Sequence, residues 1–220
     1  MTDHLPLALR SLWHELPLLA VVGVITCTAT SAVVLVIPGI NPGSVLLAAV
    51  LVAPLWCGVM ATTDSVVRGG AGGVVVLARN LKRYWLAGLG VGLVPGVVAA
   101  VALVNWELYS SSARPLLVVP LAVSGCATVL VLLASVYAFS LRVTAGLRGK
   151  SLWLTSLSLV ARAPAVPLGI LALGAVALLL GTSVTASLLL LAPGPVALFA
   201  SAGTWTTYTR SEIVHDALHR

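Results

Sequence analysis

The sequence predicts an all-α fold, a polytopic membrane helical bundle of six transmembrane helices with two cytoplasmic interfacial helices, in a single membrane domain over residues 1–220. The first observation is composition, because 60% of the residues are hydrophobic, only 8% are charged, and the mean hydropathy is +1.11. A soluble domain needs a surface that is about a quarter to a third charged. The second observation is that the apolar residues fall into blocks of roughly 20, the length that crosses a bilayer. Lipid must therefore be the solvent for most of the surface.

Six apolar stretches are the predicted spans, and only short loops remain between most of them. They are residues 17–37, 44–63, 85–104, 116–139, 164–187 and 190–207. No charged residue separates the last two stretches. Residues 1–16 precede the first stretch and predict a short interfacial helix, because Leu12 and Trp13 lie among charged side chains.

The longest interruption is the basic segment 68–85, RGGAGGVVVLARNLKRYW, whose glycines predict a helix break. The apolar residues that recur at helical spacing after these glycines are Val74, Leu77, Leu81 and Trp85. The basic residues on the opposite face are Arg79, Lys82 and Arg83. This pattern predicts a first interfacial helix that is separate from the span at 85–104.

A second basic segment follows the fourth span and includes Arg148. The polar residues that form one stripe at helical spacing just after it are Ser151, Thr155, Ser158 and Arg162. This stripe predicts the second interfacial helix. Between the third and fourth spans, residues 105–114, NWELYSSSAR, predict a polar loop.

The basic residues predict the orientation of the bundle. All 12 Lys and Arg residues except Arg114 fall on one side of the six-span arrangement. The positive-inside rule places that side, with both termini, in the cytoplasm. Arginine outnumbers lysine, and Ala, Val, Leu and Gly are abundant. This composition is typical of a GC-rich bacterial genome, so we expect a multi-pass protein of the bacterial plasma membrane.

The two basic segments also predict an internal repeat. Each places a basic turn and an amphipathic segment between two spans, in VVRGGAGGVVVLAR and in GLRGKSLWLTSLSLVAR. The six spans would then form three hairpins in the same orientation.

Two rows of small residues are candidate helix-packing or partner interfaces. Ala49 and Ala53 recur at four-residue spacing in the second span, and Gly88, Gly92 and Gly96 do so in the third. Small residues let helix backbones approach closely in a membrane. Each row can serve packing inside the chain or contact with a membrane protein partner or a second copy. The basic residues Arg79, Lys82, Arg83, Arg148 and Arg162 are candidate contacts for lipid headgroups or a cytoplasmic partner.

The residues that catalysis or ion coupling would need are missing from the predicted spans. Asp64 and Glu107 lie at span ends, and all four histidines lie in the terminal segments. The three cysteines are isolated within apolar runs, and no nucleophile, phosphate-binding or metal-ligand motif occurs. We therefore expect no enzyme, no cofactor and no metal site. The basic residues lie between apolar blocks, which excludes nucleic acid as a partner.

The first half of the chain resembles the YesL-like family of uncharacterised bacterial membrane proteins. The features that carry the resemblance are Pro38-Gly39, Pro54, the helix end at 61–68, and Arg79-Asn80-Leu81-Lys82 before the third span. The phenylalanine of the family pattern is replaced here by Val75 or Val76. The resemblance implies a helper of a carbohydrate uptake system, and it implies no catalytic residues.

The leading prediction is a non-enzymatic integral membrane accessory protein, a transport accessory that helps an ABC-type carbohydrate uptake system. Its expected partners are membrane lipid and another membrane protein. The alternative is a small-solute permease or transporter subunit in its own right, in which Pro54, Pro95 and the threonines of the first span frame a path.

Overall fold

The structure, a computed structural model, describes residues 16–67, 73–112, 114–183, 193–201, 203, 204 and 207. These residues form helices joined by short connections, so the predicted all-α class is confirmed for the described part of the chain. The elements are α2 (Leu16–Val36), α3 (Pro42–Val67), α4 (Val74–Ser112), the short 3₁₀ helix η1 (Pro115–Leu117), α5 (Val118–Thr144), α6 (Gly149–Arg162) and α7 (Ala165–Ser183). Residues 193–201 are also helical.

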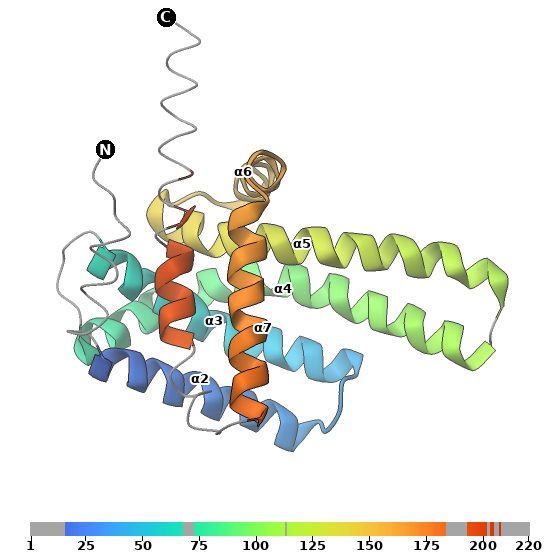
Figure 1. The fold of residues 1–220 in the computed structure, drawn as a ribbon, viewed down its shortest axis with the longest axis horizontal. Helices are drawn as coiled ribbons and strands as arrows, with labels where there is room; N and C mark the ends of the chain where they lie inside the picture. Colours follow the sequence, from blue (N-terminus) through green and yellow to red (C-terminus); the bar gives the residue numbers. More distant parts are fainter. Residues whose placement is uncertain are drawn as a thin grey trace, which may run out of the picture.

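Helices α2 to α5 lie side by side, and α7 runs across them (Figure 1). The stretches Pro42–Val66, Val74–Ser112 and Pro115–Thr144 are long and apolar enough to cross a membrane. Helices α6 and α7 would form a fourth span only as a pair bent by 90°. The apolar stretch of α2, Ala20–Val36, is shorter. The described part of the chain thus holds three to four long apolar helices, as in a membrane-spanning helical protein, and the six spans and three hairpin repeats are not confirmed.

Helix α4 corrects the predicted boundaries around the third span. A separate interfacial helix at 74–85 and a polar loop at 105–114 were expected, but one unbroken helix of 39 residues covers Val74–Ser112. The amphipathic turns continue the helical period of the apolar stretch, with Leu77 buried and the basic residues exposed. At the other end, Ser110, Ser111 and Ser112 donate to carbonyls of the preceding turn. At 1.5 Å per residue the helix is about 58 Å long, so its ends extend beyond a hydrocarbon core of roughly 30 Å.

Helix α6 keeps its predicted polar stripe out of the core. The expected polar stripe, Ser151, Thr155, Ser158 and Arg162, is exposed or half-buried. Leu152, Ser156, Leu159 and Val160 form the buried face. Tyr137 of α5 donates a 2.8 Å hydrogen bond from its hydroxyl to the carbonyl of Ala163, at the bend between α6 and α7. This bond ties the bent pair to α5.

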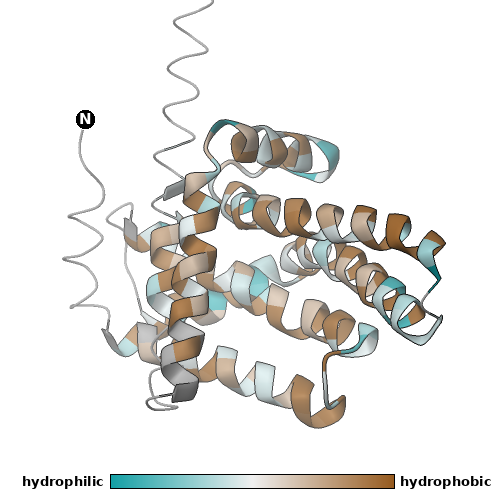
Figure 2. Ribbon diagram, turned by 45° about the vertical axis from the view of Figure 1, so that its right-hand side comes forward, coloured by the Kyte–Doolittle hydropathy of each residue, from teal (hydrophilic) through white to brown (hydrophobic). Residues whose placement is uncertain are grey.

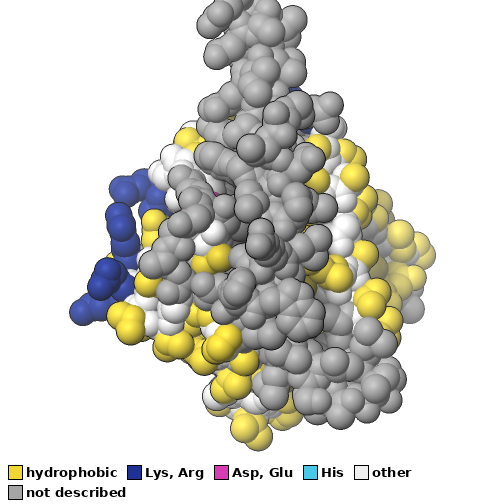
Figure 3. Space-filling view, turned by 60° about the vertical axis from the view of Figure 1, so that its left-hand side comes forward, with side chains coloured by type: hydrophobic (Ala, Val, Ile, Leu, Met, Phe, Trp, Pro, Cys, Tyr) yellow, Lys and Arg dark blue, Asp and Glu magenta, His cyan; other side chains and the backbone are white. Residues whose placement is uncertain are grey.

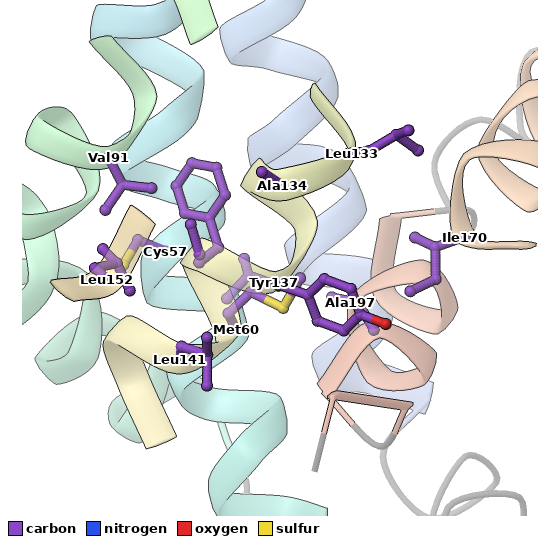
Figure 4. Close-up of a cluster of buried hydrophobic side chains, with 14 of the residues drawn as sticks. Cys57, Met60, Val91, Leu133, Ala134, Tyr137, Leu141, Leu152, Ile170 and Ala197 are labelled. Carbon is purple, nitrogen blue, oxygen red and sulfur yellow. The ribbon is translucent and has the colours of Figure 1, made fainter. Parts of the chain in front are cut away.

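The buried core draws residues from α2 to α7 and from residues 193–201, and Figure 4 shows part of it, including Ile170 of α7. Tyr137, fully buried, belongs to the same cluster as Met60 of α3 and Ala197. Hydrophobic residues make up much of the described helices (Figure 2), and many large ones are exposed, among them Leu35, Val119 and Val123. A membrane-spanning protein needs an apolar outer surface as well as a buried core, because lipid contacts the outer surface.

Several predicted features lie outside the described residues. They are the interfacial helix at residues 1–15, the glycine turn at 68–72, the end of the fifth stretch with the start of the sixth at 184–192, and the terminal segment from residue 208.

Candidate functional site

The two predicted rows of small residues meet each other in the structure. A Cβ atom added at Gly92 would lie 2.1 Å from the Cβ atom of Ala53, and one at Gly96 would lie 2.6 Å from that of Ala49. A Cβ atom at Gly88 would lie 2.6 Å from the Cα atom of Pro54. These separations are shorter than real Cβ contacts, so the α3–α4 seam, defined by these six residues, needs its glycines. The seam is an internal contact of two helices, and α3 already covers the glycine face of α4.

A groove of about 300 Å³ lies where α5 approaches the α3–α4 seam. Its walls include Ala49, Ala53, Trp56, Pro95 and Phe139, and the hydroxyl of Ser135 donates to Leu132 of its own helix. The groove therefore offers an apolar surface.

The threonines of α2 also bond within their own helix. The hydroxyl of Thr26 donates to the carbonyl of Val22, that of Thr28 to Val24, and that of Thr30 to Thr26. Threonine commonly satisfies its hydroxyl in this way inside apolar helices. Neither these threonines nor the apolar groove forms a polar path for a solute.

Of the five basic residues predicted to contact lipid headgroups or a cytoplasmic partner, three lie together and two lie apart. Arg79, Lys82 and Arg83 are exposed along the first turns of α4, and the Arg83 guanidinium lies 5.6 Å from the centroid of the Tyr84 ring. Arg148 and Arg162 are exposed at opposite ends of α6. A helix of 14 residues is about 20 Å long, so these two are well apart. Figure 3 shows Lys and Arg side chains gathered at one edge of the molecule.

A buried polar layer, which the sequence reasoning missed, joins three segments of the chain. Thr63 of α3 and Ser201 share a hydrogen bond of 3.1 Å between their hydroxyls. Asn80 of α4 donates from Nδ2 to the hydroxyl of Thr62 at 3.2 Å. Asp64 beside them lies in the last turn of α3, as predicted, and is only 9% exposed. The visible signal is the run of four polar residues, TTDS, at the end of an apolar block.

The polar layer acts as a connection between helices. The hydroxyls of Thr62 and Thr63 also bond to carbonyls of α3, and the hydroxyl of Ser201 also contacts the sulfur of Met60. Buried polar groups require such partners. Within the described residues, no group of three or more His, Cys, Asp or Glu side chains lies close enough together to hold a metal ion. The layer thus fixes how α3, α4 and the last described helix lie against one another.

No family model, curated protein or solved structure matches this chain. The features that can carry function are therefore those of the chain itself. They are the α3–α4 seam, the buried polar layer, the exposed basic residues, and the outer surface of α4 and α5.

Proposed function

We propose that this chain is a non-enzymatic accessory protein of the bacterial plasma membrane that holds another integral membrane protein against α4 and α5. The docking surface is the α4–α5 arm, defined as residues 97–112 and 114–132. The observation that carries this proposal is the exposure of the arm. Only 6% of the most apolar 18-residue window in Pro115–Thr144 is buried, and the hairpin extends past the ends of α2 and α3 (Figure 1).

The arm is held in shape by its own polar contacts. Asn105 of α4 donates from Nδ2 to the hydroxyl of Ser124 on α5 at 3.0 Å. The hydroxyl of Thr128 donates both to Ser124 of its own helix and, at 3.4 Å, to the carbonyl of Val98. A surface that is ordered before binding loses less entropy when a partner docks. The arm therefore suits a stable protein contact.

A group of small residues on α5 marks the part of the arm where a partner helix can approach closely. Ala122 and Cys126 are exposed, and a Cβ atom added at Gly125 would meet nothing within 4 Å. Helix contacts in membranes are enriched in small residues. The small residues of the α3–α4 seam are already covered, whereas this group on α5 is open.

The class of partner comes from the sequence resemblance to the YesL-like family. That resemblance makes the partner the permease of an ABC-type carbohydrate uptake system. As part of this proposal both termini face the cytoplasm, the orientation that the positive-inside rule gives for the six predicted spans.

Cross-linking from Cys126 tests this proposal. A variant with Cys27 and Cys57 replaced by alanine keeps one exposed thiol, to which a maleimide photo-cross-linker is attached in native membranes. We expect one membrane permease to be captured, and we expect Gly125→Leu to abolish its capture.

Gly169→Leu on α7 is the matched control, because a Cβ atom added at that exposed glycine would likewise meet nothing within 4 Å. The control should leave capture unchanged. Capture of lipid alone, or equal capture by the Gly125→Leu variant, contradicts the docking surface.

The alternative function, a small-solute permease or transporter subunit, lacks a polar path among the described residues. The groove beside the seam is apolar, and the hydroxyls of Thr26, Thr28 and Thr30 bond within their own helix. Purified chain in liposomes should therefore carry no sugar flux. Flux through the chain alone would favour this alternative over the accessory role.

A further inference from the structure

A second groove lies between α4 and α6, away from the proposed docking surface. It has a volume of about 550 Å³, within the range of about 300–1,000 Å³ that ligand sites occupy. Gly90 and Val94 of α4 form one wall, and Lys150, Trp153 and Leu154 of α6 lie on the other. A Cβ atom at Gly90 would meet nothing within 4 Å, so the groove is open there. Lys150 is the one charged residue in the lining.

The α4 wall of this groove continues into the basic end of the helix. Residues 79, 83, 86, 90 and 94 are spaced by three or four and therefore share one helix face. Arg83 precedes Gly90 by seven residues, or about 10 Å along the axis. Arg79 and Arg83 are both exposed. In the other direction the same face carries exposed Val97 and Val101.

This face is cationic at one end and apolar at the other, which matches the two ends of an anionic phospholipid. Arg and Lys side chains keep their charged ends at the headgroup level while their stems contact apolar surface. Trp85 lies two residues after Arg83 on α4, and Trp153 lines the groove; tryptophan is the side chain enriched at the headgroup level. A free anion would use only the cationic end and leave Val94 and Leu154 exposed.

We propose that the α4–α6 groove binds one anionic phospholipid. Lys150 and Arg83 hold the phosphate, and Gly90, Val94 and Leu154 contact the first part of an acyl chain. The exposed apolar face of α4 beyond Val94 covers the rest of that chain. The apolar end of this face, at Val97 and Val101, lies within the α4–α5 arm. Lipid binding to the purified chain is measured without a protein partner, so its failure is distinguishable from a failure of the docking proposal.

Native mass spectrometry of the purified full chain with added lipid tests the proposal. The probes are phosphatidylglycerol and phosphatidylcholine with the same acyl chains. One cationic residue near a membrane surface favours an anionic lipid about fivefold. We expect Arg83→Gln and Lys150→Gln each to weaken phosphatidylglycerol binding by about that factor, with little change for phosphatidylcholine. Gly90→Leu should weaken both lipids, because the new side chain occupies the groove.

Two controls keep this test decisive. Arg114→Gln neutralises an exposed charge that lies outside the groove, and Gly169→Leu adds the same side chain elsewhere. Both should bind phosphatidylglycerol as the unaltered chain does. If Arg114→Gln weakens binding as much as Arg83→Gln, the preference reflects net charge and the site is wrong. Displacement of the lipid by glycerol 3-phosphate alone would reduce the site to phosphate binding and would also overturn the proposal.

Discussion

The α3–α4 seam and the α4–α5 arm share one helix and similar small residues, yet they present opposite surfaces. In the seam, an added Cβ atom at Gly92 would lie 2.1 Å from the Cβ atom of Ala53. In the arm, an added Cβ atom at Gly125 would meet nothing within 4 Å. The most apolar window of α3 is 44% buried, whereas that of α5 is 6% buried. Small residues in a membrane helix therefore indicate a close contact without saying whether the partner is the same chain or another.

The two helix pairs are also held together by different forces. Close backbone approach in the seam brings many atoms into van der Waals contact, which drives helix association where no hydrophobic effect operates. The arm relies on side-chain hydrogen bonds from Asn105 and Thr128. We expect substitutions in the seam to affect folding, and substitutions on the outside of the arm to affect binding.

The largest expected effect is that of a leucine in the seam. Gly92→Leu must separate α3 from α4, and overpacking of this kind costs about 1–3 kcal/mol or more. Gly125→Leu should not lower the stability, because nothing lies within 4 Å of the added Cβ atom and leucine favours a helix over glycine by about 0.8 kcal/mol. Thermal unfolding of both variants in the same detergent measures the difference. Equal melting temperatures would remove the distinction between seam and arm.

A smaller effect is expected in the buried polar layer. Thr63→Val and Ser201→Ala each remove one side of the 3.1 Å hydrogen bond. Hydrogen bonds between membrane helices contribute about 0.6 kcal/mol on average and up to about 1.7 kcal/mol. A double-mutant cycle by unfolding in mixed micelles should give a coupling of that size. A coupling near zero would show that the layer does not join α3 to residues 193–201.

The smallest effect on global stability is expected from Asn105→Leu in the arm. It removes the 3.0 Å bond to Ser124 but leaves the core untouched. Global stability should therefore fall by less than about 0.5 kcal/mol. Amide hydrogen exchange should become faster in residues 100–112 and 118–126 and stay unchanged in α3. Faster exchange throughout α3 would contradict a separate role for the arm.

The fold class could be predicted from composition alone, and some boundaries could not. Apolar length indicates the stretches that became α3 and α5. It cannot show that α4 continues through Arg79 and Asn105, because polar residues in phase with a helix do not end it. The burial of Asp64 could not be predicted from the sequence either. Ser201, which bonds to the adjacent Thr63, is 138 residues away from it in the chain.

The candidate sites were predicted in part. The four-residue spacing drew attention to Gly88, Gly92 and Gly96, which in the structure lie against Pro54, Ala53 and Ala49 of α3. The sequence could not assign this contact to the inside of the chain. The groove beside Lys150 and Gly90 depends on α6 lying near α4, and residues 60 positions apart give no sign of that. The open group at Gly125 is likewise visible only once its surroundings are known.

The most direct test of the seam as an internal contact is to exchange the residues at positions 92 and 53, so that alanine replaces Gly92 and glycine replaces Ala53. Gly92→Ala alone should destabilise the protein by about 1–3 kcal/mol, although alanine favours a helix over glycine by about 1 kcal/mol. Adding Ala53→Gly removes the atom that the new methyl group meets. We predict that the double variant regains at least half of the lost stability, measured by reversible unfolding in mixed micelles. Strictly additive effects of the two substitutions would contradict the contact between α3 and α4.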